Sequence, residues 1–167
     1  RKRHEANLAF LAEISQDLVH LTNIDETMAA IGAKIGRHFN VARVIFSEIS
    51  EDQQTGRVSH EWHQPGVPSH ACRYPLSGWP MPWLVDGQPW VVRDVDTDPA
   101  MPDDQRTSYR GNDIGALIVV PLIKNGRLVA TLATNQHAPR DWTPDEITFV
   151  QETAERTWAA VERAYTQ

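Results

Sequence analysis

The 167-residue sequence predicts one globular domain of the α+β class, with helices at both ends and an antiparallel sheet between them. Three observations carry this prediction. Apolar residues recur at helical spacing over residues 8–21. Residues 116–135 hold two apolar strand patterns joined by Asn125-Gly126, the pair favoured in tight hairpin turns. Thr143 then opens a long helical pattern.

The first two predicted helices follow from apolar spacing and capping residues. Leu11, Ile14, Leu18 and Leu21 alternate spacings of three and four, which places them on one stripe of a helix over residues 8–21. Asn23 and Glu26 then stand in the relation of an N-cap and its N3 partner. We expect a second helix from there to about residue 40.

The middle of the chain predicts short strands around an irregular excursion. Two β-branched segments predict a hairpin, and the six prolines and three glycines between Pro65 and Pro89 disfavour long regular elements. Pro121 removes a ladder donor and predicts a bulge or the end of pairing there. The predicted strands are 41–49, 57–62, 89–95, 116–123 and 128–135, with short helical segments at 81–85 and 102–111.

The last helix has the strongest local signal in the chain. Thr143 is placed as the N-cap, Pro144 as the first helical residue, and Glu146 as the partner that closes a capping box. Its apolar stripe is longer than one small sheet can cover, so we expect its far end to pack on another helix. The stripe is Ile147, Val150, Ala154, Trp158, Val161 and Tyr165.

Composition excludes several classes of protein. The 22 acidic and 16 basic side chains leave a net charge of −6, which disfavours a nucleic-acid partner. The longest apolar stretch, residues 116–123, is far shorter than the roughly 18–20 residues that span a bilayer, so we expect a cytoplasmic protein without membrane insertion. Cys72 is the only cysteine, which rules out an internal disulfide. Helical patterns reach both ends, so we expect a module of a longer protein.

The order of these elements resembles that of a GAF domain over nearly the whole chain. Its most specific pieces are residues 118–122 with 125–132, similar to the family's penultimate hairpin, and residues 142–146, similar to the start of its last helix. Residues 154–164 resemble GAF domains of bacterial HWE-type sensor histidine kinases. The resemblance implies a single GAF domain over residues 1–167, in which residues 1–21 and 143–167 form the terminal signalling helices.

The resemblance also implies a layered architecture: the terminal helices on one face of the sheet and a lidded ligand pocket on the other. Strand residues alternate between faces. If no bulge intervenes, the pocket face takes Ile45, Ser47, Leu117, Val119, Thr131, Ala133 and Asn135, and the helix face takes Val44, Phe46, Leu128, Ala130 and Leu132. The candidate ligand-binding residues are Asn135, Thr131, Tyr109, Leu117, Val119, Ser47, Trp83 and Trp90.

Asn135 is the strongest polar candidate because its amide can both donate and accept a hydrogen bond, although a structural bond to the lid is a rival role. Trp83 and Trp90 lie in the excursion expected to roof the pocket, where their rings either stack on a planar ligand or anchor the loop. The sequence does not identify the ligand or any cofactor.

No metal site or catalytic motif is predicted. His60 and His63, with His70 and Cys72 nearby, have the ligand types of a soft metal site, but residues three apart on an unbroken strand point to opposite faces, so His60 and His63 are not expected to chelate one metal jointly. No nucleophile elbow, phosphate loop or zinc-protease motif is present, so we expect no enzymatic activity. Methionine sulfoxide reductases of the GAF fold use more than one cysteine, and this chain has one.

Two ligand classes known in the family match this sequence only in part. Cyclic-nucleotide-binding GAF domains carry an Asn-Lys pair, which is Asn135-Gln136 here. Phytochrome-type GAF domains resemble residues 128–137, but Asn135 replaces a histidine that contacts their bilin. No cysteine lies in residues 95–115, which excludes covalent bilin attachment there and leaves noncovalent binding open.

The predicted function is that of a regulatory sensor. The domain binds a small molecule and relays its state through the terminal helices to a covalently attached output domain such as a histidine kinase. The rival prediction is a ligand-free dimerisation module, in which the two helical stripes Leu11/Ile14/Leu18/Leu21 and Trp158/Val161/Tyr165 pack across a two-fold axis. A homodimer fits both readings.

Overall fold

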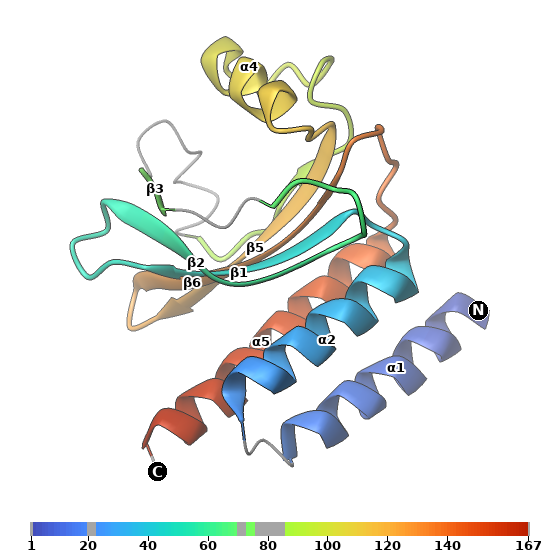
Figure 1. Cartoon of the computed structure of the whole chain (residues 1–167), viewed down its shortest axis with the longest axis vertical. Helices are drawn as coiled ribbons and strands as arrows, with labels where there is room; N and C mark the ends of the chain where they lie inside the picture. The colour runs from blue at the N-terminus through green and yellow to red at the C-terminus, as the bar shows by residue number, and fades with distance from the viewer. Residues whose placement is uncertain (1, 20–22, 70–72, 76–85, 167) are drawn as a thin grey trace.

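The computed structural model describes residues 2–19, 23–69, 73–75 and 86–166. It confirms the α+β class, with helices at both ends of an antiparallel sheet (Figure 1). Its helices are α1 (Lys2–Val19), α2 (Ile24–Phe39), α4 (Asp103–Gly111) and α5 (Pro144–Thr166). Its strands are β1 (Arg43–Ile49), β2 (Thr55–His63), β3 (Arg73–Pro75), β4 (Trp90–Val92), β5 (Ala116–Lys124) and β6 (Arg127–Gln136).

The strands form one six-stranded sheet in the order β3-β2-β1-β6-β5-β4. All its pairings are antiparallel, and β1 and β6 occupy the centre. The strand β3 was not predicted, because three residues within a proline-rich segment carry no alternation signal. The predicted helix at 81–85 lies outside the described residues.

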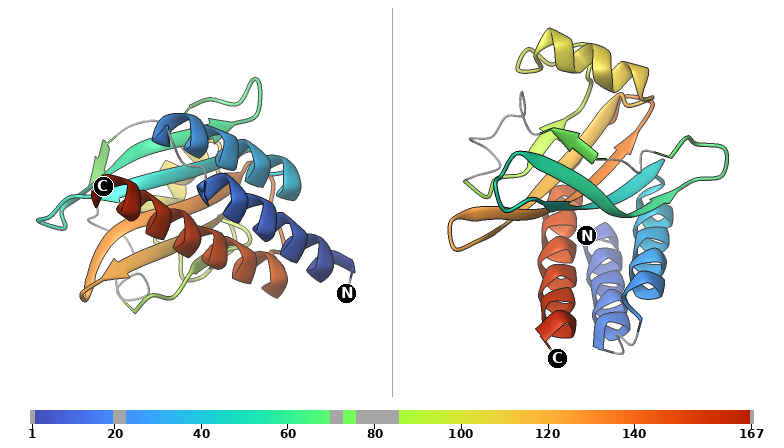
Figure 2. Two further views of the ribbon diagram at one scale, coloured as in Figure 1. Left: turned by 90° about the horizontal axis from the view of Figure 1, so that it is seen from below. Right: turned by 60° about the vertical axis from the view of Figure 1, so that its left-hand side comes forward.

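α1, α2 and α5 lie together on one face of the sheet, whereas α4 lies over the opposite face (Figure 2). α2 contacts β1 and β2, and α5 contacts β5 and β6, whereas α1 packs on α2 and α5 rather than on the strands. α1 also packs along α5, and the Arg156 guanidinium donates to the Ser15 hydroxyl at 2.9 Å. The core of this layer includes Ile14, Ile31, Ile35, Ile118, Leu132 and Phe149, each almost fully buried.

Two glycines let α2 approach the sheet closely. A Cβ atom built on Gly36 would lie 2.0 Å from the ring of Trp62, and one on Gly32 would lie 3.0 Å from the Trp62 Cβ. The indole of this β2 residue therefore occupies the space that a side chain on Gly36 would need. The helix face of β2 is packed by this direct contact between helix backbone and ring.

Local structure follows the predicted signals closely. The Asn23 side chain accepts from the Glu26 amide at 3.0 Å, which caps α2. The Glu146 amide donates to Thr143 Oγ1 at 3.1 Å while the Thr143 amide donates to Glu146 Oε1 at 2.9 Å, so the capping box at α5 is complete. Asn125 and Gly126 both have positive φ angles, 54° and 75°, as a tight hairpin turn requires.

A bulge near the β5–β6 turn overturns one predicted side-chain orientation. Leu122 pairs with Ala130 but Ile123 pairs with Leu128, so β6 holds one extra residue there. Leu128 was expected on the helix face, and the bulge moves it to the opposite face, where it joins Trp90 and Leu117. Pro121 was expected at a bulge or at the end of pairing. The pairing of β5 with β4 does end before it, at Val119, whereas the pairing with β6 continues through Pro121 and the bulge comes after Leu122.

The stripe residues proposed for a two-fold interface are used within the chain. Leu11, Ile14 and Leu18 are at most 6% exposed and pack in the helix-side core with Val161 and the partly buried Trp158. Leu21 lies outside the described residues. These side chains therefore do not form a free stripe for a partner, although homodimerisation through other helix surfaces stays a prediction.

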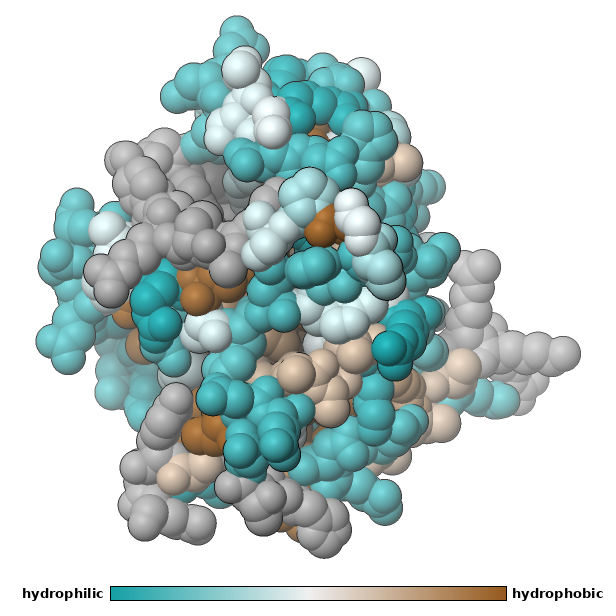
Figure 3. Space-filling model, viewed as in Figure 1, coloured by the Kyte–Doolittle hydropathy of each residue, from teal (hydrophilic) through white to brown (hydrophobic). Residues whose placement is uncertain are grey.

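The surface is largely hydrophilic in the view of Figure 3. Among the described residues the large hydrophobic side chains that are exposed are Leu8 and Val19, both on α1. Every helix in the described part of the chain is too short or too polar to span a bilayer.

Candidate functional site

The face of the sheet opposite α1, α2 and α5, called here the far face, gathers most of the predicted ligand-binding residues. Residues paired across antiparallel strands share a face. Asn135 pairs with Arg43 on one side and Leu117 on the other. One row further along, Ala133 lies between Ile45 and Val119, and Trp90 follows on β4. Thr131 pairs with Ser47 in the next row.

The apolar part of the far face is a second core, separate from the one under the helices. Trp90 is 4% exposed and its ring lies 6.0 Å from that of Tyr109 on α4, centroid to centroid. Predicted site residues Trp90, Tyr109, Leu117 and Val119 therefore come together. The cluster also contains Val92, Val95, Met101, Ile114 and Leu128. Trp83 lies outside the described residues, so its predicted role is untested.

α4 is held over this cluster by arginines that sequence reasoning did not single out as structural. Arg106 donates to the carbonyl oxygens of Val95, at 3.0 Å, and Met101, at 2.9 Å, which closes the loop before the helix. Arg110 pairs with Asp96, with Nε 2.8 Å from Oδ1. Hydrogen bonding to Arg110 lowers the pKa of the Asp96 carboxyl. These bonds fix the helix that carries Tyr109.

The polar end of the far face is built around Arg43, a residue missed by sequence reasoning. Its side chain is fully buried at the start of β1. Arg43 Nη1 donates to Asn135 Oδ1 at 3.0 Å, and Arg43 Nε donates to the Pro68 carbonyl at 2.9 Å. The alternation that placed Ile45 and Ser47 on the pocket face would also have placed Arg43 there.

The outermost part of this polar end is an acidic residue at the surface. Asp113 Oδ2 lies 3.6 Å from Arg43 Nη2, and Asp113 Oδ1 lies 2.5 Å from His137 Nδ1. Burial lowers the pKa of the Arg43 guanidinium, while Asp113 and Glu61 oppose that shift. A guanidinium stays protonated in proteins even where burial lowers its pKa, so Arg43 is a buried cation. Asn135 is therefore already the acceptor for a buried charge.

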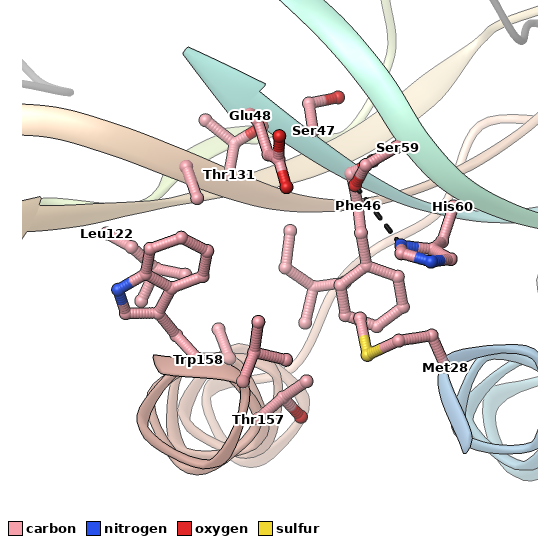
Figure 4. Close-up of a pocket in the computed structure, with 14 residues that line it drawn as sticks. Met28, Phe46, Ser47, Glu48, Ser59, His60, Leu122, Thr131, Thr157 and Trp158 are labelled. Carbon is pink, nitrogen blue, oxygen red and sulfur yellow. Dashed lines mark hydrogen bonds between the residues drawn. The ribbon is translucent and has the colours of Figure 1, made fainter. Parts of the chain in front are cut away.

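A recess also lies on the helix side of the sheet, where none was predicted (Figure 4). It opens between the sheet, α2 and α5, with Phe46, Met28 and Trp158 around it. Measured by where the centre of a water molecule fits, its volume is about 30 Å³, which suits waters rather than an organic ligand. Ser47 and Thr131 border it from their strands, although their alternation places them on the far face.

The histidines considered for a metal site are engaged separately. His60 Nε2 lies 2.8 Å from Asp25 Oδ1 on α2, whereas His63 Nδ1 lies 3.0 Å from the Gln64 carbonyl oxygen. His70 and Cys72 lie outside the described residues. Within the ranges that the structure describes, no three histidine, cysteine or acidic side chains are grouped as metal ligands.

Comparison with known families settles the class of the domain. The profile of the GAF domain matches residues 8–161, which is most of the chain and includes the sheet and both of its faces. This chain belongs to the GAF domain family. The family fold implied by the penultimate hairpin and the last helix is thus confirmed. No curated protein matches the sequence closely enough to count as a relative.

Solved GAF structures share the fold at low sequence identity. A phycocyanobilin-bound GAF domain from a cyanobacterial phytochrome is 16% identical, with a TM-score of 0.82 and 96% of each chain covered. A far-red-absorbing protein, JSC1_58120g3, with bound biliverdin is 18% identical with a TM-score of 0.81, covering 93% of this GAF domain and 99% of its own chain.

An enzyme is also among the structural neighbours of this GAF domain. The free methionine-R-sulfoxide reductase of Neisseria meningitidis, solved with its substrate, is 18% identical with a TM-score of 0.78. The match covers 98% of this chain and 93% of the reductase. At such identities these likenesses establish the shared fold, and the residues of this chain must carry any argument about its ligand.

Proposed function

We propose that this GAF domain is the sensor module of a larger signal-transduction protein, which binds a small molecule on the far face of its sheet. The observation that carries the proposal is the separation of the two faces on shared strands. On β6, Asn135 and Ala133 face the far side, while Thr134 and Leu132 face the helices. A shift of this strand on ligand binding therefore changes the surface on which α5 packs.

The relay passes through the terminal helices. α5 contacts β5 and β6 directly, and α1 contacts α5, so both ends of the chain are coupled to the strands that carry the far-face residues. A ligand shifts this arrangement only by its differential affinity for two states of the helices. The resemblance of residues 154–164 to HWE-type sensor kinases supports a histidine kinase as the attached output domain.

A role without catalysis is supported by the single cysteine of the chain. Sulfoxide reduction by GAF-fold enzymes uses more than one cysteine, so the reductase among the structural neighbours does not transfer its chemistry to this domain. The buried Arg43–Asn135 pair holds and orients a ligand but offers no nucleophile or general base. We therefore assign the far face to binding.

Homodimerisation through the terminal helices accompanies the sensor function in this proposal. Leu8 and Val19 are 52% and 76% exposed on α1, an arrangement that a partner helix would cover. Light scattering of the domain at high micromolar concentration should show a dimer that a Leu8→Ser/Val19→Ser variant weakens. A monomer in the unsubstituted domain would contradict this part of the proposal.

Native mass spectrometry of the gently purified domain tests the sensor function. We expect a noncovalent mass above the denatured mass of the chain, which would also give the weight of the ligand. Asn135→Ala should reduce the occupied fraction. A domain that carries no ligand and binds no candidate ligand would contradict the sensor function. Unchanged ligand affinity in Asn135→Ala would contradict the role of Asn135.

A noncovalent bilin photosensor is the second candidate, favoured by the two bilin-bound structures that share the fold. Residues 95–115 hold no cysteine for a covalent link, so a bilin would be retained by contacts alone. Mixing the domain with biliverdin should then give a shifted absorption band that is lost on denaturation. Free-biliverdin absorption in the presence of excess domain would exclude this candidate.

A further inference from the structure

Arg43 is a buried cation whose hydrogen-bonding capacity is only partly used. A guanidinium carries five N–H donors. Nε and Nη1 have acceptors in the Pro68 carbonyl and the Asn135 amide oxygen. Nη2 is buried and has no hydrogen-bond partner. Leaving a charged donor buried without an acceptor is costly, so this atom is a position where an additional acceptor would be stabilising.

The nearest acidic group does not satisfy Nη2. Asp113 Oδ2 is 3.6 Å away, beyond the normal range for an N–H donor to oxygen. Its other oxygen is held 2.5 Å from His137 Nδ1, which directs the carboxylate toward the imidazole. Asp113 is also 40% exposed, so the residue that faces Nη2 borders solvent although the Arg43 side chain is itself fully buried. An outside carboxylate therefore gains access to Nη2 when Asp113 moves aside.

The other acidic group near Arg43 is already occupied. Glu61 acts on Arg43 from β2, and its Oε1 accepts from the Ser69 hydroxyl at 2.5 Å. On the opposite side, Leu117 is the cross-strand partner of Asn135, and Leu117 belongs to the same apolar cluster as Tyr109. The free donor thus stands at the border between a polar end and an apolar surface.

We propose that Arg43 Nη2 anchors an anionic oxygen of the small molecule bound by this domain, a carboxylate carried on an apolar or aromatic body that lies toward Leu117. The proposal rests on the proposed sensor function and specifies the class of its ligand. Asp113 competes for the cation in the free domain, and a ligand carboxylate replaces it. The resulting pair is charge-assisted, the stronger kind of hydrogen bond.

The test uses benzoate as the probe and benzamide, its neutral counterpart of similar shape, as the matched control compound. A ligand that binds the folded state raises the unfolding temperature in proportion to its occupancy. Benzoate should raise the unfolding temperature of the domain more than benzamide does. The difference should grow in Asp113→Asn, because the competing carboxylate is gone while asparagine still accepts the φ of +66° at this position.

Variants of the two arginines separate a specific site from general attraction. Arg43→Met should abolish the difference between benzoate and benzamide, a loss of about tenfold or more in benzoate affinity. Arg57→Met removes an exposed guanidinium, paired with Glu48 at 2.8 Å, and should leave the difference unchanged. If Arg43→Met does not fold, the proposal is tested by whether the difference between benzoate and benzamide is larger in Asp113→Asn than in the unsubstituted domain.

Equal responses to benzoate and benzamide in both the unsubstituted domain and Asp113→Asn would overturn the assignment of Arg43. So would a preference for benzoate that Arg57→Met removes. Neither result bears on the sensor function. That function fails only if native mass spectrometry of the domain shows no bound ligand. A neutral ligand found by native mass spectrometry would overturn the anionic class while leaving the sensor function standing.

Discussion

The helix side of the sheet and the far side bury their side chains for different purposes. Under the helices the core is almost entirely apolar, and residues such as Ile118, Leu132 and Phe149 are at most 2% exposed. The far face combines a smaller apolar cluster with the buried Arg43–Asn135 pair. Because the same strands carry both faces, the comparison shows how one sheet supplies stability on one side and recognition on the other.

The largest expected effect breaks the helix side of this comparison. Phe149→Ala removes a ring that packs on Phe10 at 5.2 Å and on Phe39 at 4.8 Å, centroid to centroid. The variant should lose about 3–5 kcal/mol of unfolding free energy, measured by urea denaturation. Gln88→Ala, at an exposed position outside the helices, should change it by about 0.5 kcal/mol or less. Similar losses in both variants would contradict the assigned core.

A smaller loss is expected where α2 meets β2. Gly36→Ala places a methyl group 2.0 Å from the Trp62 ring and should cost about 1–3 kcal/mol through overpacking. The same substitution at Gly111, at the end of α4, meets no atom within 4 Å and should be neutral or slightly stabilising. Thermal unfolding of the two variants measures the difference. A Gly36→Ala variant as stable as Gly111→Ala would mean that α2 does not approach the sheet so closely.

Removal of the α5 cap should lower stability by less than the Gly36 substitution does. Thr143→Ala leaves the Glu146 amide without its side-chain acceptor and should cost about 1 kcal/mol. Thr107→Ala changes the same residue type at an exposed position inside α4 and should have little effect. Urea denaturation of the two variants gives the comparison. Equal effects would show that the capping box does not stabilise α5.

The smallest expected effect is a dependence on pH at His38, where the helices meet. Burial lowers the pKa of His38 below its ordinary value of 6.5. Between the lowered and the ordinary pKa the unfolded chain binds a proton that the folded chain does not, so stability falls as the pH falls through that interval. The unfolding temperature should therefore decrease from pH 7 to pH 5. His38→Gln should flatten this slope and His63→Gln should not, and the reverse pattern would contradict the assignment.

Most local structure was predictable because its causes lie within a few residues. The Asn125-Gly126 turn and the Thr143–Glu146 capping box depend on φ preference and on side chains three apart, and both form as expected. Alternation likewise placed Leu117 and Val119 correctly on the far face. These signals depend on residues that are close in sequence, so they can be recognised without knowledge of the tertiary fold.

The errors arose where distant parts of the chain decide. Leu128 changed faces because β6 accommodates an extra residue against β5, a property of the pair of strands rather than of either one. Arg43 was overlooked because a charged residue is normally exposed, and its partners at Pro68, Asp113 and Asn135 come from three separate segments. The helix-side recess likewise depends on how α2 and α5 pack.

Two neighbouring residues of β6 test the division of labour between the faces most directly. Thr134 faces the helices with a buried hydroxyl that has no hydrogen-bond partner, and Asn135 faces Arg43. Native mass spectrometry of Thr134→Val and Asn135→Ala, purified identically, compares how much ligand each variant retains. We predict occupancy equal to that of the unsubstituted domain in Thr134→Val and a marked loss in Asn135→Ala. Loss in Thr134→Val with full retention in Asn135→Ala would place recognition on the helix side and contradict the account.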